Sequence, residues 1–271
     1  MKSKTVMVLA IAAMTVFATS CEKLKARDQL NKGVQAFKSA QYPQAVEHFK
    51  TAVEYDPNFA TARLYLATGY MQQYIPGADS PENMQMATAA YDQFQKVLSQ
   101  DPTEQSKELA TASIASLLFN EKKLDEAETW YQKLIALNPK NKEAYYTLGV
   151  IAWTKALVTD GEARAKLGMK PDDPGPLKDK KVRAEVATKN SAVVDEGIKD
   201  LDKSLQIDPE YDDAMAYENL LYRQKADLEE SPEAYKADIA KANDYFQKTI
   251  DTRKVKAERK PTGGGITADT K

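Results

Sequence analysis

The sequence has almost none of the two residue types that build most catalytic and metal sites. Its 271 residues include one Cys and one His. A single Cys cannot form an intramolecular disulfide, and one Cys with one His cannot complete a Cys/His metal site or a histidine-based triad. The glycine-rich nucleotide loops and the HExxH zinc motif are also missing from the sequence. We therefore predict that the protein is not an enzyme and has no catalytic residue, metal, cofactor or small-molecule substrate.

An excess of charge of one sign is also lacking. The 38 Lys and Arg residues nearly balance the 40 Asp and Glu residues, which leaves a formal net charge of −2. Proteins that bind nucleic acid usually carry a basic excess, so we expect no nucleic-acid partner. The hydrophobic content of 42% is enough for a folded core, and the length allows one large domain or two ordinary ones.

An uncharged, largely apolar run lies at the N-terminus. Lys2 and Lys4 begin the chain, and residues 5–20 then carry no charge. As a helix these residues would rise about 24 Å, which is less than the roughly 30 Å of a bilayer's hydrocarbon core. The pattern therefore predicts a signal peptide over residues 1–20 rather than a transmembrane anchor.

The single Cys follows this run directly. Ala18-Thr19-Ser20-Cys21 resembles a bacterial lipobox, which implies lipidation of Cys21 and a lipidated tether over residues 21–25. Glu22 is not the Asp that marks inner-membrane retention in some bacteria, so the resemblance points to the periplasmic face of the outer membrane. The alternative is ordinary cleavage after Ala18, which would leave a soluble periplasmic or secreted protein with a free thiol.

A small and a large residue recur at a spacing of four along the rest of the chain. Four copies align, namely Ala45-x3-Phe49-x7-Pro57, Ala90-x3-Phe94-x7-Pro102, Ala127-x3-Tyr131-x7-Pro139 and Gly197-x3-Leu201-x7-Pro209. A fifth copy, Ala242-x3-Phe246, lacks the final Pro. Residues four apart share one face of a helix, and Pro ends the helix. A second apolar helix pattern precedes each copy, as in Leu66-Ala67-x2-Tyr70.

These paired patterns resemble the tetratricopeptide repeat, a helix-turn-helix unit of about 34 residues. The resemblance implies an all-α fold, a right-handed α-α superhelix of about five helix pairs. Five repeats and the insertions between them fill residues 26–256, so one solenoid replaces the choice between one and two domains. We expect the final helix to be polar and solubilising, as terminal repeats require, and residues 257–271 to form a disordered tail.

The fourth repeat contains a long insertion at about residues 155–189. Helix-like ends flank a segment with three Pro residues, so we expect a helical hairpin that extends beyond the stack. Residues 167–177, with residues 212–217, resemble a subtype of bacterial exported repeat lipoproteins. A possible basic patch in the insertion could contact anionic lipid or an acidic partner, but charge runs usually favour the alternative of a solvated helix face. Its residues are Lys178, Lys180, Lys181 and Arg183.

The first helix of each pair lines a concave surface in tetratricopeptide stacks. By this resemblance the partner-binding groove contains Phe37, Tyr65, Met71, Phe119, Tyr146, Trp153, Tyr217 and Arg223. Aromatic and Met side chains offer a large contact area with few rotors to freeze, which suits recognition of a peptide or helix. The alternative for each residue is that it packs the superhelix itself.

The sequence thus predicts a non-catalytic scaffold or adaptor, lipid-anchored in the bacterial cell envelope, whose partners are other proteins. The layout is similar to that of repeat lipoproteins that assemble outer-membrane proteins or a pilus secretin, and such a role is one alternative. A structural envelope protein that self-assembles through its terminal repeats is the other alternative.

Overall fold

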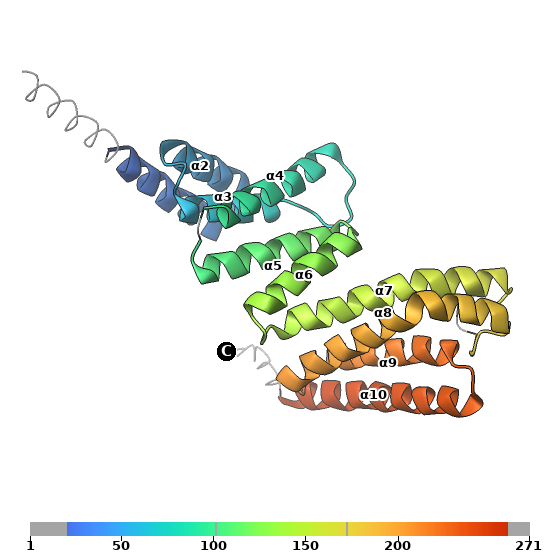
Figure 1. Ribbon diagram of the computed structural model, residues 1–271. Helices are drawn as coiled ribbons and strands as arrows, with labels where there is room; N and C mark the ends of the chain where they lie inside the picture. Colours follow the sequence, from blue (N-terminus) through green and yellow to red (C-terminus); the bar gives the residue numbers. More distant parts are fainter. Residues whose placement is uncertain (1–20, 101, 172, 260–271) are drawn as a thin grey trace, which may run out of the picture. The chain divides into compact units, whose positions relative to one another are not determined.

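The structure is a computed structural model that describes residues 21–100, 102–171 and 173–259. These residues form α-helices joined by short loops, and no β-strand occurs among them (Figure 1). They belong to two compact units, Met1–Leu137 and Asn138–Lys271, which are described separately below. The all-α fold class predicted from the sequence is confirmed.

The helices pair as consecutive hairpins. The first unit holds a helix over residues 21–38, α2 (Tyr42–Tyr55), α3 (Ala60–Met71), α4 (Pro81–Leu98), α5 (Glu104–Asn120) and α6 (Leu124–Leu137). The second unit holds α7 (Lys142–Lys166), α8 (Lys180–Ile207), α9 (Asp212–Leu228) and α10 (Pro232–Arg259). Inside each unit a helix packs against the helices before and after it, as α3 does with α2 and α4. The five predicted helix pairs are therefore confirmed.

The Pro residues of the repeat mark the ends of the second helices. α2, α6 and α8 end at Tyr55, Leu137 and Ile207, in each case two residues before the Pro. α4 ends at Leu98, further upstream of its Pro. A Pro lacks an N–H and its ring clashes with the preceding turn, so the helix must stop before it.

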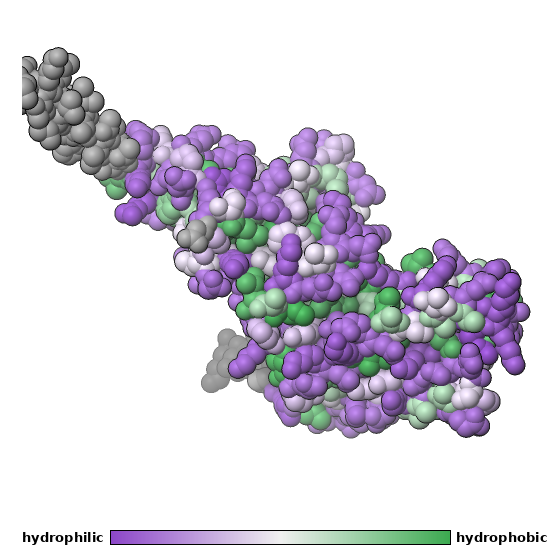
Figure 2. Space-filling model, in the orientation of Figure 1, coloured by the Kyte–Doolittle hydropathy of each residue, from purple (hydrophilic) through white to green (hydrophobic). Residues whose placement is uncertain are grey.

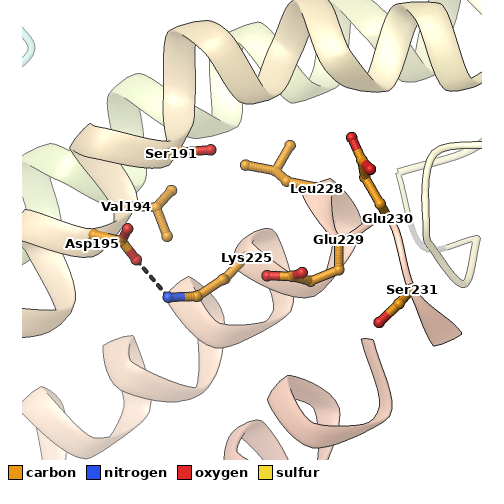
Figure 3. A pocket seen from close by; sticks show the side chains of 8 residues that line it. All are labelled: Ser191, Val194, Asp195, Lys225, Leu228, Glu229, Glu230 and Ser231. Atoms are coloured by element: carbon orange, nitrogen blue, oxygen red, sulfur yellow. Dashed lines mark hydrogen bonds and ion pairs between the residues drawn. The ribbon is translucent and has the colours of Figure 1, made fainter. Parts of the chain in front are cut away.

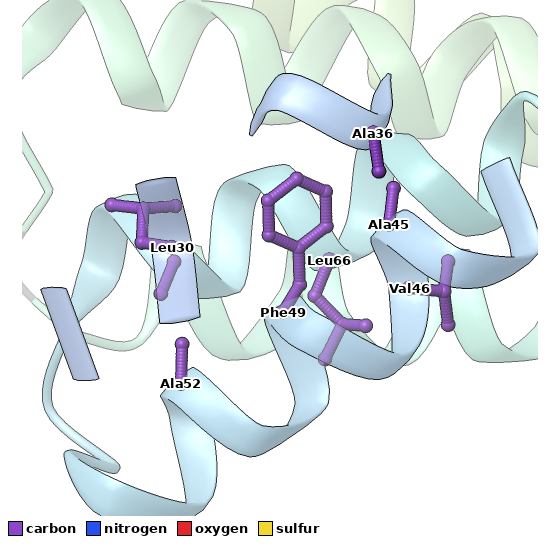
Figure 4. Packing of buried hydrophobic residues seen from close by; sticks show 8 residues of the cluster. Leu30, Ala36, Ala45, Val46, Phe49, Ala52 and Leu66 are labelled. Carbon is purple, nitrogen blue, oxygen red and sulfur yellow. The ribbon is translucent and has the colours of Figure 1, made fainter. Parts of the chain in front are cut away.

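Small and large side chains interlock in the core of the first unit (Figure 4). Phe49 on α2 is fully buried, and its ring lies against Gly33 on the preceding helix. A Cβ atom at Gly33 would overlap this ring, so the close approach of the two helices requires a residue without a side chain. On α3, Leu66 joins the same cluster and the Tyr65 ring lies 5.4 Å from that of Phe49.

The second unit repeats this packing around α8. Leu201, the large residue of the repeated pair, is fully buried. Val194, seven residues upstream on the same helix face, is also buried. Ala156 of α7 and Leu221 of α9 complete the same cluster. Two buried side chains on α8 also bond to α7 backbone carbonyls: Ser204 donates to Lys142 at 3.0 Å and Asn190 donates to Ala156 at 3.0 Å.

The predicted hairpin extension is present, and its tip has a core of its own. α7 and α8 are the long helices that form it, and residues 167–179 connect them. Ala163, Met169, Leu177 and Val186 pack together there. The connection is therefore a folded part of the unit rather than a loose loop.

A buried ionic network centred on Arg164 holds this tip. Arg164 donates from Nε to Asp160 at 2.7 Å, from Nη1 to the Asp173 carbonyl at 2.8 Å, and from Nη2 to the Asp227 carboxylate. Burial opposes the charge of Arg164, but Asp227 and Asp160 together raise its pKa above the ordinary value. Because Asp227 belongs to α9, the network ties the tip to the neighbouring helix pair.

Several boundaries differ from the sequence predictions. Residues 21–25, expected to be a tether, are helical and continue into the first helix. α10 runs to Arg259, whereas the predicted repeat ends at residue 256. The predicted signal peptide and the rest of the predicted tail lie outside the described residues.

The final helix exposes large apolar side chains among its many charged residues. Phe246 and Ile250 of α10 are 54% and 45% exposed. Hydrophilic side chains nevertheless dominate the displayed surface of each unit, with apolar side chains in small patches (Figure 2). No helix within the described part of the chain is long and apolar enough to cross a membrane.

Candidate functional site

Aromatic residues of the predicted groove come together in the second unit. Tyr146 and Trp153 lie two turns apart on α7, and Tyr217 of α9 contacts both. The Tyr217 ring meets Tyr146 edge-on at 5.6 Å and Trp153 edge-on at 5.4 Å. Tyr211, immediately before α9, adds a fourth ring 5.1 Å from Tyr146. We call these four residues the aromatic ladder.

The repeat itself aligns the ladder. α7 and α9 are the first helices of consecutive pairs and pack against each other. Residues seven apart share a helix face, so Tyr146 and Trp153 both point toward the same side of α9. All four rings are half-buried and pack against the core of the second unit with one side. Part of each side chain stays exposed to solvent.

The electrostatics of the ladder favour apolar and neutral hydrogen-bonding contacts. Burial, together with nearby carboxylates such as Asp213, raises the pKa of Tyr146 and Tyr217 and raises that of Tyr211 to about 12. The phenols are therefore neutral at physiological pH. The nearby cation, Lys142, lies over the Tyr211 ring at 4.9 Å and donates to Asp208 at 2.6 Å, so its charge is already paired.

The first-unit residues of the predicted groove are arranged differently. The rings of Phe37 and Tyr65 lie 6.5 Å and 5.4 Å from the buried Phe49 ring, and both side chains pack against the core cluster. Met71 and Phe119 are half-buried on α3 and α5. Phe37 and Tyr65 thus pack against a core cluster, as the ladder residues do in the second unit. Within the second unit the structure brings Tyr146, Trp153 and Tyr217 together.

Arg223, predicted to lie in the groove, is exposed on α9 and hydrogen-bonded to two Asn side chains. Its guanidinium donates to Asn219 at 3.0 Å on α9 and to Asn243 at 2.9 Å on α10. These bonds connect the two helices of the last pair. Arg223 is exposed, and these two hydrogen bonds go to Asn side chains rather than to a residue of the ladder.

The predicted basic patch is wrong in one of its four members. Lys178, Lys180 and Lys181 are exposed around the start of α8. Arg183 is only 8% exposed and donates to the Leu177 carbonyl at 3.1 Å, because its side chain folds back under the tip. The three lysines remain a predicted basic patch on the surface.

A cavity of about 460 Å³ lies beside α8, α9 and the start of α10 (Figure 3). At one side Lys225 donates to Asp195 at 2.6 Å, which raises the pKa of Lys225. Glu229 and Glu230 line the opposite side, near Ser231. Ser231 accepts a hydrogen bond from the Ala234 N–H at 3.0 Å and so caps α10. The lining is acidic, and none of its residues is a His or Cys that could activate a serine.

The remaining candidates for chemistry are isolated. No cluster of His, Cys, Asp or Glu in the described ranges is arranged to hold a metal ion. His48 Nδ1 lies 2.7 Å from the Gln29 side-chain oxygen, as expected of a satisfied structural histidine. The Cys21 thiol is exposed at the start of the described chain.

Two notable residues were not singled out in the sequence. Tyr211 joins the ladder, but it precedes the helix and no repeat position marks it. Glu218 could have been found from the register, because it fills the slot that Leu66 and Leu148 occupy in other repeats, nine residues after the repeat's Pro. The Glu218 side chain is fully buried there, and neither of its carboxylate oxygens accepts a hydrogen bond.

Paired antiparallel helices with interlocking small and large residues define a helical-repeat protein. Family models match two parts of the chain, "Tetratricopeptide repeat" over residues 30–73 and "TPR repeat" over residues 115–155. The chain therefore contains tetratricopeptide repeats, as its sequence resemblance predicts. No curated protein matches the sequence.

Solved structures with the same fold cover most of the chain. MamA is 19% identical with a TM-score of 0.57 over 87% of this chain and 96% of its own. MamA from Desulfovibrio magneticus RS-1 is 16% identical with a TM-score of 0.54, over 85% and 96% of the two chains. YrrB, described as a TPR protein with an unusual peptide-binding site, is 17% identical with a TM-score of 0.53, over 85% and 90%. At these identities the similarity shows the fold.

Proposed function

We propose that the protein is a non-catalytic scaffold or adaptor that binds a peptide or helix of another protein on the aromatic ladder. The observation that carries this proposal is the row of half-buried rings on adjacent first helices, formed by Tyr211, Tyr146, Tyr217 and Trp153. Helical-repeat proteins use the concave surface of their first helices to bind partners. A peptide-binding site is also described for YrrB, which shares the fold.

The chemistry of the ladder suggests the kind of partner. Neutral rings pack best against apolar or aromatic side chains, and their hydroxyls can bond to a peptide backbone. The paired state of Lys142 leaves little unpaired charge beside the rings. We therefore expect partner affinity to change little between low and high salt, unlike an interface steered by charge.

Photocrosslinking in cells would identify the partner, with the crosslinking residue placed at Tyr217. The affinity of the purified pair would then be measured for Trp153→Ala and Tyr217→Ala. We expect each change to weaken binding about tenfold or more, because aromatic anchors dominate such interfaces. The control is Trp130→Ala, which removes a half-buried Trp of α6 outside the ladder. Unchanged affinity in both ladder variants would refute the proposal.

We also propose that the protein is exported and anchored by a lipid on Cys21 at the periplasmic face of the outer membrane. The N-terminal pattern supports this, and the exposed Cys21 thiol is accessible for acylation. Cys21→Ser should move the protein from the membrane fraction to the soluble fraction. Mass spectrometry of the mature wild-type N-terminus gives the decisive reading: an unmodified Cys21, or a chain that begins at Thr19, would exclude the anchor.

A further inference from the structure

One position of the repeat has a different environment in the last helix. The large residue of the repeated pair is Phe49 on α2, Phe94 on α4, Tyr131 on α6 and Leu201 on α8. Tyr131 is 8% exposed and the other three are fully buried. The same position on α10 is Phe246, which is 54% exposed. Single exposed apolar residues are common on protein surfaces, but this one occupies a slot that is otherwise core.

A second position shows the same difference. One turn beyond the large residue, the repeats carry an aliphatic side chain, namely Val53, Leu98 and Leu205, each of which is half-buried. On α10 this residue is Ile250, and it is 45% exposed. The last helix therefore keeps the sequence of a stacking surface without its burial.

The helix that follows accounts for the burial in the earlier pairs. α3 covers α2, with the Tyr65 ring 5.4 Å from Phe49, and α9 contributes Leu221 to the cluster around Leu201. α10 packs against α9 through the buried Ala242 and through Tyr245, which stacks on Tyr222 at 5.9 Å. No helix in the described part of the chain follows α10 to cover its other side.

One side of α10 carries a row of apolar residues. Ile239, Phe246, Ile250 and Ala257 recur at spacings of seven and four residues, which places them on one helix face over about 27 Å. We call these four residues the α10 stacking face. Polar residues border this row: Arg253, which is bound to Asp212 of α9 at 2.8 Å, and the exposed Asn243 and Lys254.

The first described helix, over residues 21–38, carries polar residues at the positions where α3 contacts the helix before it. At the positions equivalent to Ala62, Tyr65 and Gly69 of α3, the helix over residues 21–38 carries Asp28, Asn31 and Gln35, and all three are exposed. A second copy stacked head to tail would place these polar groups on the α10 stacking face and bury them without partners, which is costly. The occupant is therefore expected to be a different protein.

We propose that the α10 stacking face binds an amphipathic helix of a different protein, which lies on α10 as the first helix of a sixth repeat would. The face continues the interface that stacks one helix pair on the next inside each unit. By analogy with Tyr65 and Gly69 of α3, the bound helix should present a large residue one turn before a small one. This surface is distinct from the aromatic ladder, so the two could hold different partners at once.

A peptide that copies residues 58–74, which include α3, is a suitable probe because α3 covers a Phe and Val pair on α2. Its fluorescein-labelled form would be titrated with the full-length protein in fluorescence anisotropy. We expect binding that Phe246→Asp weakens at least about tenfold. The matched control is Val255→Asp, which changes another exposed apolar residue on α10 outside the stacking face. A control peptide with Ala62→Asp, Tyr65→Asn and Gly69→Gln should lose binding to the same extent.

Each outcome decides the proposal. Absence of binding, or equal binding by wild type and Phe246→Asp, overturns it. If Phe246→Asp unfolds, Ile250→Gln gives the same comparison. Sedimentation velocity that shows dimers lost in the variant would assign the face to a second copy and overturn the choice of partner. Binding that appears only after removal of residues 260–271 would assign the face to the chain's own tail. Trp153→Ala should leave peptide binding unchanged, which separates this test from that of the aromatic ladder.

Discussion

The buried carboxyl group of Glu218 should make the stability of the protein depend on pH. Glu218 is fully buried on α9 in a slot that Leu fills in other repeats, and no donor bonds to its oxygens. Burial, reinforced by the adjacent Asp202 of α8, raises the pKa of Glu218 to about 9. Tyr222 of the same helix, and Tyr245 and Lys241 of α10, are the other titratable groups around it.

The sign and size of the effect follow from linkage. In the unfolded chain Glu218 ionises near pH 4.3, whereas in the folded protein it keeps its proton up to about pH 9. Below pH 4 Glu218 is protonated in both the folded and the unfolded state, so its ionisation does not change the free energy of unfolding. Between these values the folded state loses about 1.4 kcal/mol of stability per pH unit from this group. At pH 7, about 2.7 pH units above the unfolded value, the accumulated loss is about 4 kcal/mol.

Glu218→Gln removes this titration while keeping the size of the side chain. We would measure free energies of unfolding in urea for wild type and variant from pH 5 to pH 8. The free energy of unfolding of the variant should rise relative to that of the wild type by about 1.4 kcal/mol per pH unit. The other titrating groups are common to both proteins, so their contributions cancel in the difference. The matched control is Glu230→Gln, the same substitution at an exposed position. A difference that is constant with pH would refute the reasoning, since it would mean that Glu218 is ionised in the folded protein.

Three further substitutions test individual contacts in the structure. Arg164→Met should lower the free energy of unfolding by about 3 to 5 kcal/mol, because Asp227 would stay buried without its partner, and circular dichroism melts would show this as a lower Tm. Gly33→Ala should cost about 1 to 3 kcal/mol through overlap with the Phe49 ring, and a wild-type Tm would contradict the close packing of Phe49 against Gly33. Asp208→Asn should cost less than about 1 kcal/mol near neutral pH. The hydrogen bond from Lys142 lowers the pKa of Asp208. The difference in free energy of unfolding between wild type and Asp208→Asn, measured in urea titrations, should therefore vanish as the pH falls below 4.

Much of the fold could be predicted because the signals for it are local. A small residue four positions before a large one places both on a single helix face, and the following Pro stops the helix whatever its neighbours are. These signals gave the five helix pairs, the core role of Phe49 and Leu201, and the hairpin extension. The boundaries at residues 21–25 and at Arg259 were missed because nothing in those segments interrupts a helix.

The candidate site was predicted only in part because its members are distant in sequence. The register placed Tyr146, Trp153 and Tyr217 on the first helices, but their contact depends on how closely α7 and α9 pack. The same register placed the exposed Arg223 in the groove, but it gave no sign of the hydrogen bond from Arg223 to Asn243 of α10. A repeat pattern describes the average environment of a position and cannot report the side chain that lies opposite it.

By itself the sequence determined the helical repeats, because periodicity and Pro act within one or two turns of the chain. Only the tertiary structure decided what each position does. Arg164 meets an Asp 63 residues away, and Arg183 turns inward under the tip although it lies in a run of exposed lysines. Phe246 has the repeat's core sequence, yet it is exposed in the described structure because no helix there covers α10. Burial is a property of neighbouring helices, and the neighbours are set by the packing of the whole array.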